Sequence, residues 1–259
     1  MNGLHLSVVG KGGAGKSVIS ATLARLLARA GHDVLALDSD MMPGLSLSLG
    51  ADVPAEPPLN AAAEKDENGR WRLRKGIGPV RAVRGYSIEA PDGVRLLQAG
   101  KSGPEGLAPI MGAIHAFHTV IHRIRRARSL DQWAIVGDLS AGPRQTAYDW
   151  APYADRLVLV AEPTWQSILT ARRIARIART RSAGVELLLV VNKVTAPADV
   201  RRVEGALELP AVAAVPLDED VRAAERQGIA LLDHSPSSPS VAAIERLVAH
   251  LEDGRLRGP

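Results

Sequence analysis

The chain has 259 residues and a formal net charge of +4; 46% of its residues are hydrophobic but only 3% are aromatic. This length favours one α/β domain, and a core of Ala, Val, Leu and Ile suits helices packed on a parallel sheet. The absence of cysteine excludes disulfides, thiolate nucleophiles and cysteine-ligated clusters. The sequence shows no basic-then-apolar leader and no apolar run of the ~20 residues that a membrane span needs, so we expect a soluble, cytoplasmic protein.

Short apolar runs alternate with helical periodicity along the chain. Strands are expected at 4–9, 33–37, 94–98, 133–136, 156–160, 186–191 and 212–215, and helices at 16–30, near 105–128, at 165–181 and near 239–251. Residues 51–90 form an irregular excursion rich in proline, with an alternating segment from Trp71 that suggests a hairpin. This order predicts an α/β fold, a doubly wound, mostly parallel sheet flanked by helices, in a single domain over 1–259. The functional site should lie at the carboxyl ends of the strands.

The segment Gly10-Lys-Gly-Gly-Ala-Gly-Lys-Ser17 fits the phosphate-loop pattern G-x-x-x-x-G-K-[ST], with an expected strand before it and a helix after it. In such a loop, backbone N–H groups converge on phosphate oxygens, and the helix N-terminus adds partial positive charge. Lys16 should reach the β- and γ-phosphates, and the Ser17 hydroxyl should ligate Mg²⁺. The residues expected to contact the nucleotide are Gly12, Gly13, Ala14, Gly15, Lys16, Ser17 and Val18. The alternative is a glycine turn that binds nothing.

A second lysine, Lys11, lies inside the glycine run, where repulsion from Lys16 is unfavourable unless an anion is present. The variant loop K-G-G-x-G-K-S resembles that of the ATPase family that includes MinD, ParA, the nitrogenase iron protein and the CooC proteins. In that family the early lysine reaches the nucleotide of a partner subunit, so that ATP is sandwiched in a homodimer. The resemblance therefore implies a P-loop ATPase that uses ATP and Mg²⁺, with Lys11 acting across the subunit interface.

Three carboxylates follow predicted strands. Asp38 and Asp40 lie one residue apart, and in an extended segment both would point into the site. Asp138 follows the strand at 133–136 and opens the segment Asp-Leu-Ser-Ala-Gly142. By resemblance to the family's D-x-D and D-x-x-A-G segments, Asp40 orients the attacking water, Asp38 lies close to Mg²⁺, and Asp138 holds Mg²⁺ through water. Each carboxylate could instead cap a helix.

Two further segments follow predicted strands near the end of the chain. Asn192 and Lys193 resemble the family's adenine reader, and an Asn amide can donate and accept at once. Pro216-Leu-Asp218 resembles the segment that closes the base pocket. We therefore expect Asn192, Lys193, Pro216 and Asp218 to form the base pocket.

Several longer stretches resemble CooC proteins rather than ParA or MinD, among them Glu162-Pro-Thr and Leu231-Leu-Asp. CooC proteins carry a C-x-C pair before Pro-Glu, and here the corresponding loop reads Gly100-Lys-Ser-Gly-Pro-Glu105. The absence of these cysteines excludes a thiolate metal site and argues against the nickel handling that the resemblance to CooC proteins would imply. The usual proline after D-x-D is also displaced, to Pro43.

Three histidines follow that loop at helical spacing: His115, His118 and His122. On one helix they would lie within about 60° of one another and could hold Zn²⁺ or Ni²⁺. The alternative, which we favour, is a polar stripe beside a core-facing row of Ile and Phe.

Arg172, Arg176 and Arg179 share one face of the helix at 165–181, which could grip DNA phosphates or simply be solvated. The helix near 239–251 has acidic residues on its polar face, which disfavours a membrane anchor. Two functions therefore remain open. The first is a CooC-like accessory ATPase that dimerises with ATP, hydrolyses it slowly and acts on an unidentified client protein. The alternative is a ParA- or MinD-like partition or positioning ATPase with ATP-gated binding to DNA or a cell structure.

Overall fold

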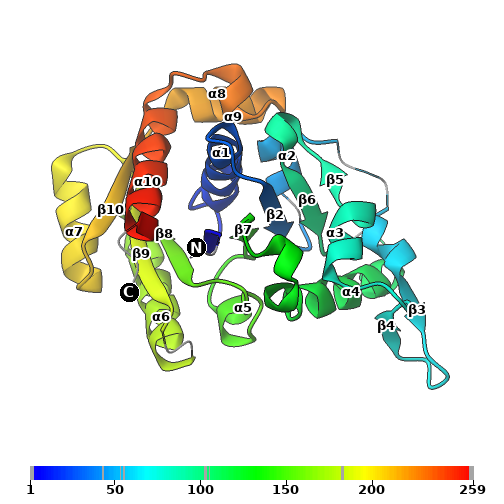
Figure 1. The fold of residues 1–259 in the computed structure, drawn as a ribbon. Coiled ribbons are helices and arrows are strands. Elements are labelled where there is room, and N and C mark those ends of the chain that lie inside the picture. Colours follow the sequence, from blue (N-terminus) through cyan, green and yellow to red (C-terminus); the bar gives the residue numbers. More distant parts are fainter. Residues whose placement is uncertain are drawn as a thin grey trace.

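The computed structural model describes residues 3–42, 44–52, 54, 56–101, 104, 106–181 and 184–256. An eight-stranded sheet in the order β10-β9-β8-β1-β7-β2-β6-β5 forms its centre, and a two-stranded hairpin, β3-β4, stands apart from it (Figure 1). The strands of the large sheet are β1 (His5–Gly10), β2 (Val34–Asp38), β5 (Ile88–Glu89), β6 (Arg95–Gln98), β7 (Ala134–Asp138), β8 (Arg156–Ala161), β9 (Glu186–Val194) and β10 (Ala211–Pro216). All neighbouring pairs are parallel except β5 with β6. The prediction of a mostly parallel sheet is therefore confirmed.

The described helices are α1 (Lys16–Arg29), α2 (Leu45–Leu49), α3 (Pro79–Tyr86), α4 (Met111–Ile121), α5 (Arg144–Ala147), α6 (Trp165–Arg181), α7 (Pro197–Leu207), α8 (Glu219–Gln227), α9 (Leu231–His234) and α10 (Pro239–Leu256). Helices α1 and α10 cover one face of the sheet, and α4 and α6 cover the other (Figure 1). None of the helices in the described part of the chain combines the length and apolarity that crossing a membrane requires.

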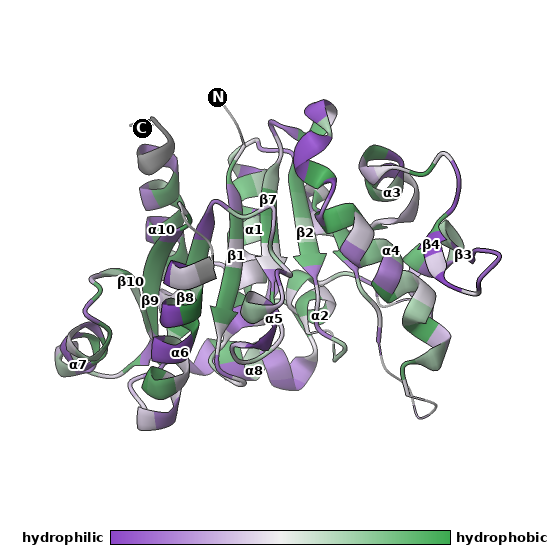
Figure 2. Ribbon diagram, turned by 90° about the horizontal axis from the view of Figure 1, so that it is seen from below, coloured by the Kyte–Doolittle hydropathy of each residue, from purple (hydrophilic) through white to green (hydrophobic). Residues whose placement is uncertain are grey.

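Alternation along each strand sends side chains into two separate cores. On β1, Leu6 and Val8 pack with α1 and α10, whereas Val9 packs with the helices on the opposite face. Because both faces are covered, β1 and β2 are buried along their whole length. Hydrophobic residues make up much of the central strands (Figure 2). The carboxyl ends of β1 and β2 point toward the edge where α2, α5 and α8 lie (Figure 2).

The irregular excursion contains the hairpin that the sequence suggested. Strands β3 (Ala63–Lys65) and β4 (Trp71–Leu73) pair in antiparallel fashion and lie at the margin of the molecule beside α4 (Figure 1). The hairpin packs closely on Gly112 of α4. A Cβ at this position would lie only 3.1 Å from the Trp71 ring, so a larger residue would be crowded there.

The prediction of one helix over 105–128 was wrong. Within the described residues α4 covers only Met111–Ile121, and short 3₁₀ turns lie at Ala108–Ile110, Ile124–Arg126 and Arg128–Leu130. Pro109 lacks the N–H that a continuing helix would need. After α4 the chain turns tightly, which carries Ile124 and Leu130 back into the core.

Candidate functional site

The glycine loop connects β1 to α1 at the carboxyl edge of the sheet. Gly13 and Gly15 have positive φ angles of 77° and 89°, which only glycine adopts at little cost. A Cβ at Gly15 would lie 2.3 Å from Nδ2 of Asn192. Lys16 is buried, and its Nζ donates to the carbonyl of Lys11 at 3.4 Å. The loop therefore contacts the Lys16 side chain through its own backbone, and α1 begins at Lys16.

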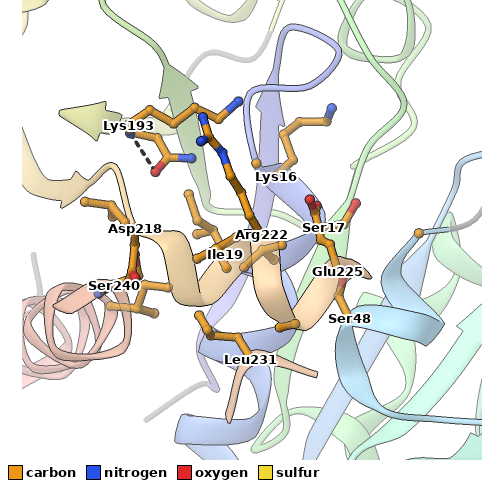
Figure 3. A pocket seen from close by; sticks show the side chains of 18 of the residues that line it. Lys16, Ser17, Ile19, Ser48, Lys193, Asp218, Arg222, Glu225, Leu231 and Ser240 are labelled. Atoms are coloured by element: carbon orange, nitrogen blue, oxygen red, sulfur yellow. Dashed lines mark hydrogen bonds between the residues drawn. The ribbon is translucent and has the colours of Figure 1, made fainter. Parts of the chain in front are cut away.

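Asn192 and Lys193 of β9 hold this loop, although β8 lies between β9 and β1 in the sheet. Asn192 donates from Nδ2 to the carbonyl of Ala14 at 2.7 Å, and its Oδ1 accepts from the N–H of Lys193 at 2.9 Å (Figure 3). Lys193 donates from Nζ to the carbonyl of Gly13 at 2.6 Å and pairs with Glu162 at 2.6 Å. Both residues lie inside β9, not after it as the sequence suggested. The contacts to the loop explain their position, and adenine recognition by Asn192 stays a prediction.

Glu162 is a site residue whose role the sequence did not reveal. It follows β8 and is buried, and its N–H donates to Oγ of Ser167 at 2.9 Å. Its carboxylate neutralises Lys193 beside the glycine loop. The nearby stretch Glu162-Pro-Thr resembled CooC proteins, but nothing in its spacing indicated contact with Lys193.

A cavity of about 510 Å³ adjoins the loop (Figure 3). One wall is formed by Ser17 and Ile19 of α1, and the other by α8 and the segment that precedes it. Pro216 and Asp218 both line it, together with Asn192 and Lys193. The structure therefore brings the four residues expected at the base pocket to one cavity, next to Gly13, Gly15, Lys16 and Val18 of the loop.

Asp218 also caps α8. Its carboxylate accepts from the N–H of Asp220 at 2.9 Å and from the N–H of Ser240 at 3.0 Å. Partial burial raises the pKa of this carboxyl, but the hydrogen bonds from Ser240 and Asp220 outweigh burial and lower the pKa below its usual value. The carboxylate is thus engaged in joining α8 to α10.

Asp38 and Asp138 form a buried pair of like charges. They are aligned in the register of β2 and β7, and their exposed fractions are 0% and 2%. Burial, and then the charge of Asp138, raise the pKa of Asp38 well above its usual value. Burial raises the pKa of Asp138 to about 6, although Ser17 donates to its Oδ2 at 2.6 Å and Lys16 is nearby. These oxygens suit Mg²⁺, which prefers carboxylate and hydroxyl ligands.

Asp40 differs from the expectation. Strand β2 ends at Asp38, so Asp40 lies in the loop after the strand and not in the strand itself. Its N–H donates to Oδ1 of Asp38 at 3.0 Å, and its own Oδ1 accepts from the N–H of Met42 at 3.1 Å. Asp40 remains half-buried beside the carboxylate pair.

Lys11 lies at the rim of the loop. Its Nζ donates to the carbonyl of Gly12 at 3.2 Å, and among the described residues it forms no ion pair. Gly12 is exposed next to it. Lys11 is thus a half-buried cation of the glycine loop for which the described residues provide no ion-pair partner.

The three histidines are not arranged as a metal centre. In the part of the chain that the structure describes, no group of three His, Cys, Asp or Glu side chains could hold a metal ion. The rings of His118 and His122 lie 4.3 Å apart, and His118 meets Trp150 edge-on at 5.4 Å. Burial, and then the neighbouring His122, lower the pKa of His118. In the loop Gly100–Glu105, residues Ser102, Gly103 and Glu105 lie outside the described residues, as does Pro43.

The arginines of α6 line a groove of about 320 Å³ against α7. Arg172, Arg176 and Arg179 all contribute to it. Arg172 donates from Nε to the carbonyl of Ala206 at 2.7 Å, which satisfies a carbonyl in the last turn of α7. At least one of the three arginines thus has a structural task.

The site combines a glycine loop between a strand and a helix, a buried lysine in that loop, and two carboxylates at the ends of adjacent parallel strands. This combination defines a P-loop nucleotide-binding ATPase. The description "CobQ/CobB/MinD/ParA nucleotide binding domain" belongs to the family whose sequence profile matches residues 7–231. The chain belongs to this family. It is an ATPase that uses ATP and Mg²⁺.

Curated relatives match the chain over most of its length. It is 27% identical over 247 residues to the carbon monoxide dehydrogenase accessory protein CooC of Rhodospirillum rubrum, covering 90% of this chain and 91% of that protein. It is 30% identical over 254 residues to an uncharacterized ATP-binding protein of Methanocaldococcus jannaschii, covering 93% and 84%. The CooC-like resemblance is therefore supported.

Solved structures confirm the fold. A ParA family ATPase from Chlorobium tepidum superposes with a TM-score of 0.72 at 18% identity, covering 97% of this chain and 100% of that one. The septum site-determining protein MinD of Pyrococcus horikoshii, complexed with Mg-ADP, superposes with a TM-score of 0.65 at 20% identity, covering 96% and 95%.

Proposed function

We propose that this ATPase is a dimerisation switch: two copies close face to face around ATP, slow hydrolysis parts them, and the cycle serves a client protein. The observation that carries this proposal is Lys11. It is a cation at the mouth of the phosphate loop, and the described residues provide no ion-pair partner for it. The γ-phosphate of a nucleotide on a facing copy would supply the missing anion.

The surface around this mouth supports the same proposal. Met42, Tyr148 and Trp165 are large apolar side chains that are exposed to solvent. They follow β2, β7 and β8, so they lie at the edge of the sheet that also holds the phosphate loop. A second copy of the chain would bury them.

The residues of the site suit hydrolysis in such a dimer. Lys16 and the loop amides would bind the phosphates, and Ser17, Asp38 and Asp138 would hold Mg²⁺. When bound, Mg²⁺ neutralises charge on the β- and γ-phosphates. Asp40 orients the attacking water, and Lys11 of the facing subunit stabilises charge that develops in the transition state. Phosphoryl transfer needs little more than this positioning and charge neutralisation.

The likeness to CooC, which is named as an accessory protein, supports a client protein as the output of the cycle. Because the chain contains no cysteine, a thiolate-held metal cannot be what the dimer delivers. We therefore propose a maturation or loading role in which the conformation of the dimer acts on the client.

One observation favours a second function: the arginine-lined groove between α6 and α7. It would suit ATP-gated binding to DNA phosphates in the manner of a partition ATPase. The likeness to solved ParA and MinD structures adds only the fold, since these identities are near 20%.

Light scattering with ATP, with ADP and without nucleotide tests the switch. A dimer that appears only with ATP and Mg²⁺ is expected, and a monomer under all three conditions would contradict the proposal. DNA binding measured over a series of salt concentrations, with and without ATP, separates the two outputs. Salt-sensitive binding that requires ATP, and that weakens in Arg176→Ala, would favour the partition function over the client function.

A further inference from the structure

Gln145 of α5 joins the two loops that carry the three carboxylates. Its Oε1 accepts from Oγ of Ser39 at 2.6 Å and from the N–H of Ser140 at 2.8 Å. Its Nε2 donates to the carbonyl of Ser39 at 2.8 Å. Ser39 lies between Asp38 and Asp40, and Ser140 lies two residues after Asp138. One side-chain amide therefore uses both of its ends to bridge the loops after β2 and β7.

The Gln145 amide connects the two chain segments just beyond the last backbone hydrogen bond between β2 and β7. Strands β2 and β7 pair as far as Asp38 and Asp138, and one more backbone bond follows, from the N–H of Ser39 to the carbonyl of Asp138 at 3.2 Å. Beyond it, Gln145 stands between the carbonyl of Ser39 and the N–H of Ser140, as an inserted peptide unit would. The two loops are thus held apart by the width of one amide group.

The loop after β7 is itself fixed to the phosphate loop. The N–H of Gly142 donates at 2.9 Å to the carbonyl of Gly10, where the phosphate loop begins, and the N–H of Leu139 donates at 3.1 Å to the carbonyl of Val8 in β1. Gln145 extends this chain of contacts to Ser39, the residue before Asp40. A weaker direct contact, from Oγ of Ser140 to the carbonyl of Ser39, measures 3.5 Å, at the limit of a hydrogen bond.

We propose that Gln145 is a positioning residue for hydrolysis: it sets the distance between Asp40 and the phosphate loop. The inference rests on the proposed role of Asp40 in orienting the attacking water. A neutral amide suits this place for two reasons. It offers both a donor and an acceptor, and it adds no further negative charge beside Asp38, Asp40 and Asp138.

The inference predicts a split between catalysis and binding. Gln145→Met keeps a similar length but removes the three hydrogen bonds, so Asp40 would be held less well. Because a displacement of about 1 Å can cost ~100-fold in rate, kcat should fall about 10- to 100-fold. The affinity for ADP should change by less than about 3-fold, since Lys16 and the loop amides remain, and the KM for ATP should follow the affinity for ADP, not kcat.

Gln145→Glu is the second variant, and Gln132→Met is the matched control. The carboxylate of Gln145→Glu keeps the acceptor for Ser39 and Ser140, but it loses the donor and adds a negative charge beside Asp38, Asp40 and Asp138, so kcat should fall at least as far as in Gln145→Met. Gln132 is exposed and precedes the opposite end of β7, so its variant should match wild type. Steady-state hydrolysis and titration with a fluorescent ADP analogue provide the readouts, and thermal unfolding with ADP shows that each variant is folded.

Two results would overturn the inference. One is a Gln145→Met chain whose kcat stays within about 2-fold of wild type. The other is a parallel loss of kcat and ADP affinity, because that would make Gln145 a support of the phosphate loop and not of Asp40. If the wild-type protein itself failed to hydrolyse ATP, the proposed role of Asp40 would be wrong, and the inference would be wrong with it. This outcome is distinguishable from the other two, because in both of them the wild-type protein is active.

Discussion

Two clusters of buried charge lie along the same helix, α1, and they are balanced in opposite ways. Arg25 has a side chain that is 3% exposed and pairs with Asp92 at 2.6 Å and with Asp233 at 2.7 Å. At the first turn of α1, Ser17 contacts Asp138, which is buried against a second carboxylate, Asp38. The first cluster contains its own counter-charges, whereas the second places two like charges together.

The difference separates structural charge from functional charge. Burying a charge is costly unless it is paired, so an internally neutralised cluster contributes to the fold, and a cluster left unbalanced is completed by a ligand. Arg25 connects three segments through Asp92, Asp233 and the carbonyl of Leu49. The carboxylate pair, in contrast, is expected to be completed by Mg²⁺, and the two lysines of the loop by phosphate.

The largest effect is expected from breaking the neutralised cluster. Arg25→Ala should lower the free energy of unfolding by about 3–5 kcal/mol, because it leaves two carboxylates without their buried partner. Arg29→Ala is the control: Arg29 lies on the same helix and contacts the same Asp92 at 3.1 Å, but it is 41% exposed, so a loss below about 1 kcal/mol is expected. Urea unfolding of both variants measures this, and equal losses would contradict the distinction.

Lys16→Ala tests, through ATP binding, whether the charged groups at the first turn of α1 form a ligand site. Removing a buried, charge-assisted contact to phosphate should weaken ATP binding by roughly 2–5 kcal/mol. The stability without nucleotide should change little, since Lys16 has no internal ion pair among the described residues. Calorimetry gives the affinity, and the exposed Lys75→Ala is the matched control. Near-normal ATP affinity in Lys16→Ala would refute the assignment of the loop.

Asp138→Asn should have opposite effects on stability and on ligand binding. The change removes one of two buried like charges, so the nucleotide-free protein should gain about 1–2 kcal/mol of stability. The enhancement of ATP binding by Mg²⁺ should fall, because one of the proposed ligand oxygens is lost. Urea unfolding without nucleotide and calorimetry with and without Mg²⁺ provide the measurements. A variant less stable than wild type would show that Asp138 is primarily structural.

The smallest expected effect is the pH dependence that Asp92 gives to the free energy of unfolding. Burial raises the pKa of Asp92, but hydrogen bonds from Arg25 and Arg29 outweigh burial and lower the pKa below its usual value. The stabilisation is therefore complete above the unfolded-state pKa of about 3.9, and it is lost as pH falls through the lower folded-state value. Over that acidic range wild type should lose more stability than Asp92→Asn. Parallel pH profiles of the two proteins would contradict this.

The sequence predicted the sheet well, because apolar runs bounded by loop residues identify buried parallel strands with little ambiguity. It could not predict the burial of Arg25, which depends on partners 67 and 208 residues away. In the helical pattern of α1 this arginine resembles any solvated cation. The same reason applies to Gln145, whose partner Ser39 lies 106 residues earlier in the chain.

At the site, motif order indicated which residues assemble but not how. The sequence predicted that Asn192, Lys193, Pro216 and Asp218 would lie together, and they line one cavity. It did not predict that Asn192 and Lys193 hold the loop backbone, or that Asp218 joins α8 to α10. Those hydrogen bonds depend on the side-chain geometry of the folded protein.

The central claim is that Lys11 is completed by a second subunit. Lys11→Ala should leave the affinity for ADP nearly unchanged, because Lys16, the loop amides and the cavity remain. It should abolish ATP-driven dimerisation with itself and hydrolysis, since both symmetric lysine–phosphate contacts are lost. Asp40→Ala should bind ATP and dimerise, but it should not hydrolyse ATP because the attacking water is no longer oriented.

Mixing these two inactive variants is the most direct test. In a heterodimer, the Asp40→Ala chain supplies Lys11 to the ATP bound by the Lys11→Ala chain, which still has Asp40, so one composite site is intact. Partial ATPase activity that rises toward an intermediate mixing ratio is the expected result. Absence of activity at every ratio, while sedimentation shows that heterodimers form, would mean that Lys11 acts within its own subunit and would contradict the account.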